Sequence, residues 1–109
     1  MTGFRGDTTS CYRRKKLYER TIEQELAARV KAMGGIAPKF TSPGFDGMPD
    51  RLVLLPGGRM GFVELKAPGR KPRPLQLVRH RLLRRLGFKV YVIDEINQID
   101  SVLEEIDHE

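Results

Sequence analysis

Two short apolar segments joined by a glycine-rich turn constrain the fold of this 109-residue chain more than any other feature. Residues 51–55 (RLVLL) and 61–66 (GFVELK) have the length of β-strands, and Pro56-Gly57-Gly58-Arg59 connects them. Two strands with so short a connection most simply form an antiparallel hairpin. If the hairpin turns about Gly57, Asp50 lies directly opposite Glu64.

Helices are expected before and after this hairpin. Residues 17–33 have the spacing of an amphipathic helix that ends at Gly34-Gly35, with apolar residues at Ile22, Leu26, Val30 and Met33. Residues 75–86 form a second predicted helix after the stiff segment around Pro72 and Pro74, with one stripe made of Leu75, Val78, Leu82 and Leu86.

A third strand and a last helix complete the pattern. Residues 89–93 (KVYVI) are a strand that follows Gly87. Asn97 is expected to cap the last helix, whose inward-facing residues are Ile99, Val102, Leu103 and Ile106. A strand, a helix and a strand in succession imply a parallel pair beside the hairpin. The fold class is therefore α/β, a mixed β-sheet with flanking helices in the order α-β-β-α-β-α.

Length and composition limit the organisation of the chain. Residues 1–16 are polar and basic without an apolar period, and we predict a mobile N-terminal arm there and one domain over residues 17–109. No apolar run approaches the ~20 residues of a membrane-spanning helix, so no membrane partner is expected. Cys11 is the only cysteine, which excludes an internal disulfide and a cysteine-based zinc site. We expect a cytoplasmic protein of a bacterial or phage-infected cell.

The charge of the chain points to a polyanionic partner. Twenty Lys and Arg against fourteen Asp and Glu give a net charge of +6 and a pI near 9.8. Nucleic acid is the commonest partner of so basic a domain. A basic surface that only aids solubility, or binding to anionic lipid, remains an alternative.

Against this basic background, Asp50, Glu64 and Lys66 are the candidate catalytic residues. Opposed residues of a hairpin have Cβ atoms only ~4.5–5.5 Å apart, so two carboxylates there repel each other unless a cation lies between them. Lys66 is two residues beyond Glu64 and projects from the same face of the sheet. Carboxylates that bind magnesium, with a lysine beside them, are the groups that phosphodiester hydrolysis requires. The alternative is a surface hairpin that carries these three residues by chance.

The order of these motifs resembles a known nuclease family. Pro49-Asp50, thirteen further residues and then Glu64-Leu65-Lys66 match the PD-(D/E)xK signature. Gly47-Met48-Pro49-Asp50-Arg51, the segment from Phe62 to Gly69, Pro74-Leu75-Gln76 and the strand that follows Gly87 are similar to short stand-alone members of the virus-type replication-repair nuclease family, VRR-Nuc.

The resemblance implies a restriction-endonuclease-like core and a role for individual residues. Asp50, Glu64 and the Leu65 main-chain carbonyl would bind Mg²⁺ or Mn²⁺, and Lys66 would be the catalytic lysine. Glu23 would complete the site through water or a second metal, with Glu19 one turn earlier as the other candidate. Gln76 matches a glutamine that opens the helix after the catalytic strand. The family also implies a homodimer that cuts branched DNA such as four-way junctions.

A basic track that lacks acidic residues between Lys66 and Lys89 is the predicted DNA-binding segment. Lysine and arginine bind phosphate without reading sequence. The residues that we assign to DNA binding are Arg70, Lys71, Arg73, Arg79, His80 and Arg84. Three alternatives stay open: a non-catalytic DNA-binding module with this fold, a nuclease that cuts flaps or unbranched duplex, and an enzyme that acts on RNA.

Overall fold

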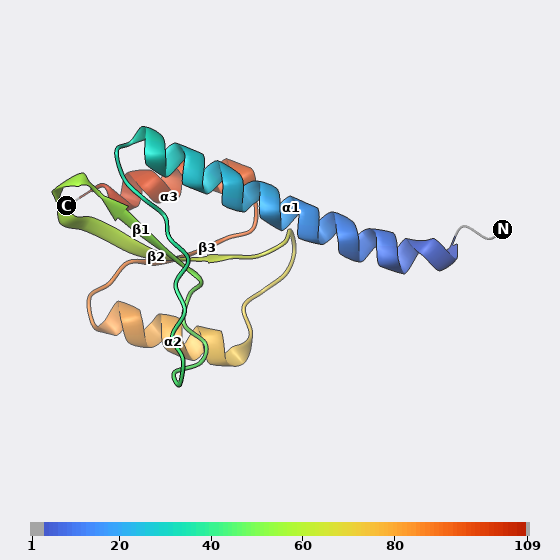
Figure 1. Cartoon of the computed structure of the whole chain (residues 1–109). Helices are drawn as coiled ribbons and strands as arrows, with labels where there is room; N and C mark the ends of the chain where they lie inside the picture. The colour runs from blue at the N-terminus through green and yellow to red at the C-terminus, as the bar shows by residue number, and fades with distance from the viewer. Residues whose placement is uncertain (1–3, 109) are drawn as a thin grey trace.

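In the computed structural model, which describes residues 4–108 and side chains from residue 18 onward, a three-stranded sheet lies between helices (Figure 1). The elements follow the predicted order: α1 (Phe4–Ala32), β1 (Arg51–Leu55), β2 (Arg59–Leu65), α2 (Pro74–Arg85), β3 (Val90–Ile93) and α3 (Ile99–Ile106). Two short 3₁₀ turns, η1 (Pro56–Gly58) and η2 (Ile96–Gln98), precede β2 and α3. The α/β class and the mixed sheet are confirmed.

The hairpin of β1 and β2 has the predicted register. Arg51 pairs with Val63 and Leu55 with Arg59 in antiparallel order, and the chain turns at Gly57 with a φ of 86°. A φ in this region favours glycine, since other residues meet a steric penalty there. The same register, continued by one residue beyond β1, puts Asp50 opposite Glu64.

Strand β2 is the central strand. It pairs in parallel with β3, from Phe62 opposite Val90 to Leu65 opposite Ile93, and α2 makes the crossover between them. On its other side, β1 has a covered outer edge. Residues 36–40 run antiparallel along it, and Phe40 N donates to Asp50 O at 2.8 Å. We call residues 36–40 the edge segment; such cover protects an exposed strand from pairing with other chains.

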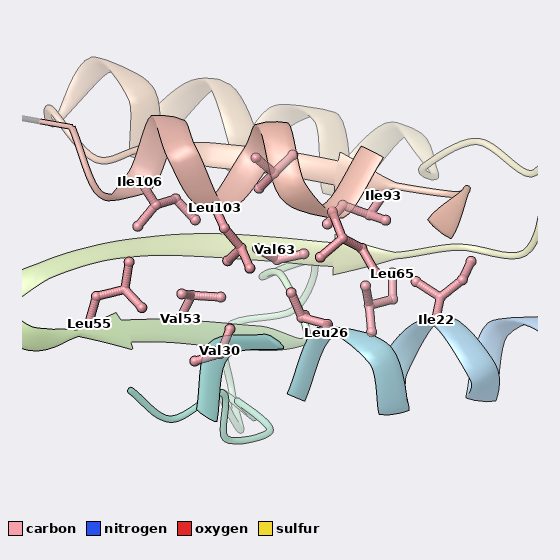
Figure 2. Close-up of a cluster of buried hydrophobic side chains, with 12 residues drawn as sticks. Ile22, Leu26, Val30, Val53, Leu55, Val63, Leu65, Ile93, Leu103 and Ile106 are labelled. Carbon is pink, nitrogen blue, oxygen red and sulfur yellow. The ribbon is translucent and has the colours of Figure 1, made fainter. Parts of the chain in front are cut away.

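The main core lies between the sheet and the pair α1 and α3, which cover the same face (Figures 1 and 2). Alternate residues of the strands point to this face because the side-chain period of a strand is two. The buried residues come from five elements and include the four predicted inward residues of α3: Ile22, Leu26, Val30, Val53, Leu55, Val63, Leu65, Ile93, Ile99, Val102, Leu103 and Ile106.

Helix α2 covers the opposite face together with Phe40 and Met48 from the segment before β1, and it packs differently from what an apolar stripe suggests. Its buried residues are Gln76, His80 and Leu83. The stripe is instead turned away from the sheet: Leu75, Val78 and Leu86 are exposed, and Leu82 is half-buried. The sheet face beneath α2 includes Glu64, and a buried carboxylate requires hydrogen-bond donors that leucine lacks.

Two predicted boundaries are wrong. Helix α1 begins at Phe4, so residues 4–16 of the predicted arm are helical, and only residues 1–3 of the arm lie outside the described part of the chain. This first part of α1 projects beyond the sheet (Figure 1), and lysine and arginine, good helix formers, propagate a helix that packing has nucleated further along.

Asn97 does not cap α3, because it lies inside η2. Gln98 is the N-cap residue of α3 but makes no side-chain hydrogen bond to that helix; its Oε1 accepts hydrogen bonds from the N–H groups of Asp94 and Glu95 at the start of η2, at 2.9 and 3.2 Å. The longer glutamine side chain reaches back over the tight turn to donors that an asparagine within it cannot satisfy.

Candidate active site

Glu64 is the centre of the site. It lies next to the last residue of β2, on the face that α2 covers, and only 3% of its surface is exposed. Its Oε2 accepts a hydrogen bond from Gln76 Nε2 at 3.0 Å and lies 3.2 Å from Lys66 Nζ. Its Oε1 is buried without a partner among the described residues. An unpartnered carboxylate oxygen in the interior is costly, which makes this atom a natural ligand for a cation.

Asp50 lies beside Glu64, as the hairpin register predicts. Its Oδ1 accepts a hydrogen bond from Leu65 N at 3.2 Å. Burial raises the pKa of Asp50 from 3.8 to about 7, and the charge of Glu64 acts in the same direction; the Leu65 N–H and the charge of Arg51 oppose this only in part. A buried carboxylate whose ionised form is disfavoured by a neighbouring carboxylate is typical of a site that binds a positive ion.

Gln76 joins the site to the start of α2. Its Oε1 accepts a hydrogen bond from Arg73 N at 2.8 Å, which satisfies a free N–H at the helix N-terminus. Its Nε2 donates to Glu64. The amide thus uses both its ends, one to fix the helix and one to hold the carboxylate. The structure therefore brings Asp50, Glu64, Lys66 and Gln76 together.

Glu23, a further predicted site residue, forms its ion pair with Arg51 and not with the residues around Glu64. Its Oε2 lies 2.7 Å from Nη2 of Arg51, and Nη1 of the same guanidinium donates to Ala37 O at 3.0 Å. Arg51 is buried, and it ties α1 to β1 and to the edge segment. Glu23 and Asp50 line one cavity of about 230 Å³, so a water-mediated contact between them is sterically open. The α1 carboxylate whose charge acts on the pKa of Asp50 is Glu19.

His80 does not suit the predicted contact with DNA. Only 1% of its surface is exposed, and its Nε2 has no hydrogen-bond partner among the described residues. Burial lowers its pKa, and the charges of Arg84 and Lys66 lower it further, so the ring is neutral at pH 7. The helical spacing that puts His80 one turn from Gln76 also turns it towards the sheet.

The predicted DNA-binding arginines fall into two groups. Arg79 donates to Asp46 O at 2.8 Å and lies 3.8 Å above the ring of Phe45, and Arg84 donates to Val90 O at 2.8 Å. These two side chains are engaged in holding α2 to its neighbours. In contrast, Arg70, Lys71 and Arg73 are exposed in the connector between β2 and α2.

The residues present fit a divalent cation with few protein ligands. Among the residues that the structure describes, no three His, Cys, Asp or Glu side chains gather closely enough to hold a metal by themselves. The donors at hand are Asp50, the unpartnered Oε1 of Glu64 and the main chain of Leu65. Magnesium accepts such a site, since it usually keeps several waters and binds through one or two carboxylates and substrate phosphate.

Comparisons with known proteins agree with this geometry. No family model matches the sequence. "Putative nuclease p44" of Acyrthosiphon pisum secondary endosymbiont phage 1 is 52% identical over 85 residues, which cover 78% of this chain and 90% of that protein. A solved structure of a VRR_NUC domain superposes with a TM-score of 0.74 at 36% identity, over 80% of this chain and 95% of that chain.

The chain belongs to the VRR-Nuc family of nucleases. The match to the solved VRR_NUC domain also accounts for the mixed sheet and its flanking helices. Over residues 4–108, no helix has both the length and the apolar character that a membrane span needs.

Sequence reasoning missed two residues of this VRR-Nuc site. Arg51 directly follows Asp50 in the motif, yet nothing near it in sequence shows that it pairs with Glu23. Lys39 lines the cavity beside Asp50. A single lysine between Pro38 and Phe40 gives no periodic signal, and only the backbone pairing of the edge segment brings it to the site.

Proposed function

We propose that this protein is a metal-dependent endonuclease that hydrolyses DNA phosphodiester bonds, with Asp50, Glu64 and Lys66 as its catalytic residues. The observation that carries the proposal is the buried Glu64, which has one oxygen held by Gln76 and Lys66 and the other without a partner beside Asp50. Membership of the VRR-Nuc family supports the same chemistry.

Asp50, Glu64 and the Leu65 carbonyl would hold Mg²⁺ or Mn²⁺, with Glu23 or Glu19 acting through water. When bound, such an ion supplies an activated water and charge stabilisation at the phosphate. Asp50 accepts the Leu65 N–H, and this bond orients its carboxylate towards Glu64. Gln76 fixes the rotamer of Glu64 through the 3.0 Å hydrogen bond.

Lys66 supplies the positive charge that the chain itself offers to the reaction. Its ammonium lies against Glu64 Oε2, and its side chain is 18% exposed at the open end of the hairpin. From there it donates to the attacking water or to a phosphate oxygen as negative charge develops. A preorganised donor of this kind typically contributes a factor of about 10²–10³ to the rate.

The test is a cleavage assay on labelled four-way junction, flap and linear duplex with Mg²⁺, with Mn²⁺ and with EDTA. We expect metal-dependent cutting that falls about 10²- to 10³-fold in Lys66→Ala. Lys31→Ala, which removes an exposed lysine from the last turn of α1, is the matched control and should cut normally. Cutting by Lys66→Ala at the wild-type rate would refute the catalytic assignment. DNA binding without cutting under any metal would favour a non-catalytic binding module.

We further propose that the enzyme acts on branched DNA as a homodimer, joined through the apolar stripe of α2. Leu75, Val78, Leu82 and Leu86 span the length of the 12-residue helix. In the described part of the chain, no other helix lies on this face of the sheet (Figure 1). The loop before β1 lies against Leu75 at Gly47, whereas Val78 and Leu86 stay exposed to a second copy. About a twofold axis, Leu75 of one copy meets Leu86 of the other, and two active sites so related suit the near-twofold symmetry of a four-way junction.

The energetics favour a weak dimer that DNA strengthens. Burying the exposed part of each of the four side chains contributes about 1 kcal/mol, and the twofold axis doubles the sum to about 8 kcal/mol. Association costs about 4–15 kcal/mol, so the stripe alone is near balance. Arg81 and Arg85 lie beside the stripe, and their repulsion across the axis is relieved by salt or by phosphate.

Sedimentation velocity with two matched variants tests the dimer. Val78 and Leu77 are 43% and 42% exposed, but Leu77 lies off the stripe. Val78→Glu should sediment as a monomer, whereas wild type and Leu77→Glu should form dimers. A wild-type protein that stays monomeric with and without a junction, or equal effects of the two variants, would overturn this interface. Preference for a flap or an unbranched duplex in the cleavage assay would remove the junction assignment alone.

A further inference from the structure

Two adjoining cavities lie beside the carboxylate pair, and Glu23 and Lys39 line both of them. The first, of about 230 Å³, is also lined by Asp50 and Arg51. The second, of about 240 Å³, extends to Glu19 and Arg20 of α1. Because they share two residues, the cavities form one cleft between α1 and the edge segment, with Asp50 at its inner end. We call it the α1 cleft.

Lys39 and Arg20 are the described cations of the α1 cleft that stay available to a ligand, and of these two only Lys39 shares a cavity with Asp50. Glu23 and Arg51 neutralise each other at 2.7 Å. Lys39 is exposed, and within the described part of the chain its side chain takes part in no hydrogen bond or ion pair. Its ammonium is therefore a free positive charge at the mouth of a cleft that leads to Asp50. The ordinary explanation of such a residue is a solvated surface lysine, and the backbone argues against it.

The backbone fixes Lys39 next to the reacting position. Lys39 forms an antiparallel bridge with Arg51, and Phe40 N donates to the carbonyl of Asp50 at 2.8 Å. Bridged residues have Cα atoms about 4.5–5.5 Å apart, so Lys39 is held one residue from Asp50 on a strand edge that cannot shift freely. A surface lysine with no role needs no such placement.

The order of the segments across this end of the sheet adds a second argument. The edge segment with Lys39 lies outside β1, and then come Asp50 and Glu64. The connector that leaves β2 is joined to Glu64 through Gln76, and it carries the exposed cations Arg70, Lys71 and Arg73. Side chains suited to phosphate are thus linked to both members of the carboxylate pair, Lys39 to Asp50 and the connector to Glu64.

We infer that Lys39 binds the backbone phosphate next to the one that is cut, and that the α1 cleft receives the DNA strand on that side of the reaction. Lys39 is a binding residue, and the connector cations hold the strand on the other side. This inference rests on the proposed nuclease function for the identity of the ligand. It adds a contact outside the segment between Lys66 and Lys89.

The salt dependence of binding measures this contact directly. The affinity of wild type, Lys39→Met and Lys31→Met for a fluorescent four-way junction is determined between about 50 and 200 mM salt, with calcium in place of magnesium. The slope of log K against log salt is negative, and each lost phosphate contact reduces its magnitude by about 0.9. We expect this decrease in Lys39→Met and none in Lys31→Met, although both lose one exposed lysine.

A neutral methylphosphonate, placed in turn at each phosphate around the cut, locates the contact. At the phosphate that Lys39 binds, the substitution should weaken wild type but not Lys39→Met. An unchanged slope in Lys39→Met, or an equal loss in both proteins at every position, would overturn the inference.

The same preparations are assayed for cutting with magnesium. Lys39-dependent binding without cutting would refute the proposed nuclease activity and leave the phosphate contact standing. Normal cutting, with no effect of Lys39→Met on the salt dependence of binding, would refute the Lys39 contact and leave the proposed nuclease activity standing. If wild type binds no DNA, both fall.

Discussion

Replacing Asp50 by asparagine should stabilise the metal-free protein while it abolishes catalysis. Asparagine keeps an oxygen that accepts the Leu65 N–H, but it removes the charge that faces Glu64. The pKa of Asp50 is raised to about 7 in the folded protein, mainly by burial and then by Glu64, against 3.8 in an unfolded chain. The folded state therefore disfavours the ionised carboxyl. The free energy of unfolding of wild type should fall as the pH rises from about 4 to about 7 and then level off.

The size of the effect follows from these two pKa values. Each pH unit between them is worth ~1.4 kcal/mol, so above pH 7 the ionised Asp50 costs the metal-free fold about 4 kcal/mol. Below about pH 4 the carboxyl is protonated in both states and the cost vanishes. Asp50→Asn carries no such group, so its advantage over wild type should grow from near zero at pH 4 to about 4 kcal/mol at pH 8.

Urea unfolding measures this difference when it is carried out in EDTA at a series of pH values from about 4 to about 8. Asp46→Asn is the matched control, because it removes an exposed carboxylate from the nearby loop. Magnesium should narrow the gap at pH 8, since a cation that binds only the folded wild type stabilises it. If Asp50→Asn were no more stable than Asp46→Asn at pH 8 in EDTA, the argument that burial and Glu64 strain this carboxylate would be wrong.

Three further outcomes follow from the packing and the hydrogen bonds. Gly61→Ala should lower the free energy of unfolding by about 1–3 kcal/mol in urea, because a Cβ there would lie 2.8 Å from Ile106 Cδ1. Arg51→Met should lower the free energy of unfolding by about 1–3 kcal/mol, because Glu23 and Ala37 O lose their donor. As a control, Arg29→Met breaks more exposed ion pairs and should change the free energy of unfolding by less than about 1 kcal/mol. Gln76→Leu should reduce metal affinity about 10- to 100-fold in titrations followed by cleavage rate, and wild-type metal dependence in this variant would contradict the role of the Glu64 contact.

The hairpin and the central site were accessible from sequence because their information is local. Strand length, the glycine at a positive φ and the period of two together determine which residue lies opposite Asp50. Lys66 and Gln76 follow within a few residues, and family resemblance adds their roles. The helical period of 3.6 likewise predicts correctly which residues of α3 face the core.

The orientation of α2 was not accessible in this way. An apolar stripe on a helix predicts only that one side avoids water, and here the side that packs on the sheet carries Gln76 and His80. The deciding interaction is the hydrogen bond from Gln76 to the buried Glu64, which joins α2 to β2. The pairing of Glu23 with Arg51 and the placement of Lys39 also depend on contacts between distant segments, and no local pattern records them.

The hydrogen bonds of Gln76 couple the position of Glu64 to the path of the connector between β2 and α2. Gln76 holds Glu64 with its amide nitrogen and the Arg73 main chain with its amide oxygen. The position of the carboxylate and the path of the basic connector are therefore coupled by one side chain. In the proposed function, a strand of DNA that binds Arg70, Lys71 and Arg73 would thereby be positioned relative to Glu64, whereas cations with no link to the carboxylate would not fix the position of the phosphate. Gln76 is buried, and both its hydrogen bonds are formed without DNA. The conformational entropy of ordering Glu64 and the connector is therefore lost when the protein folds and not when it binds DNA.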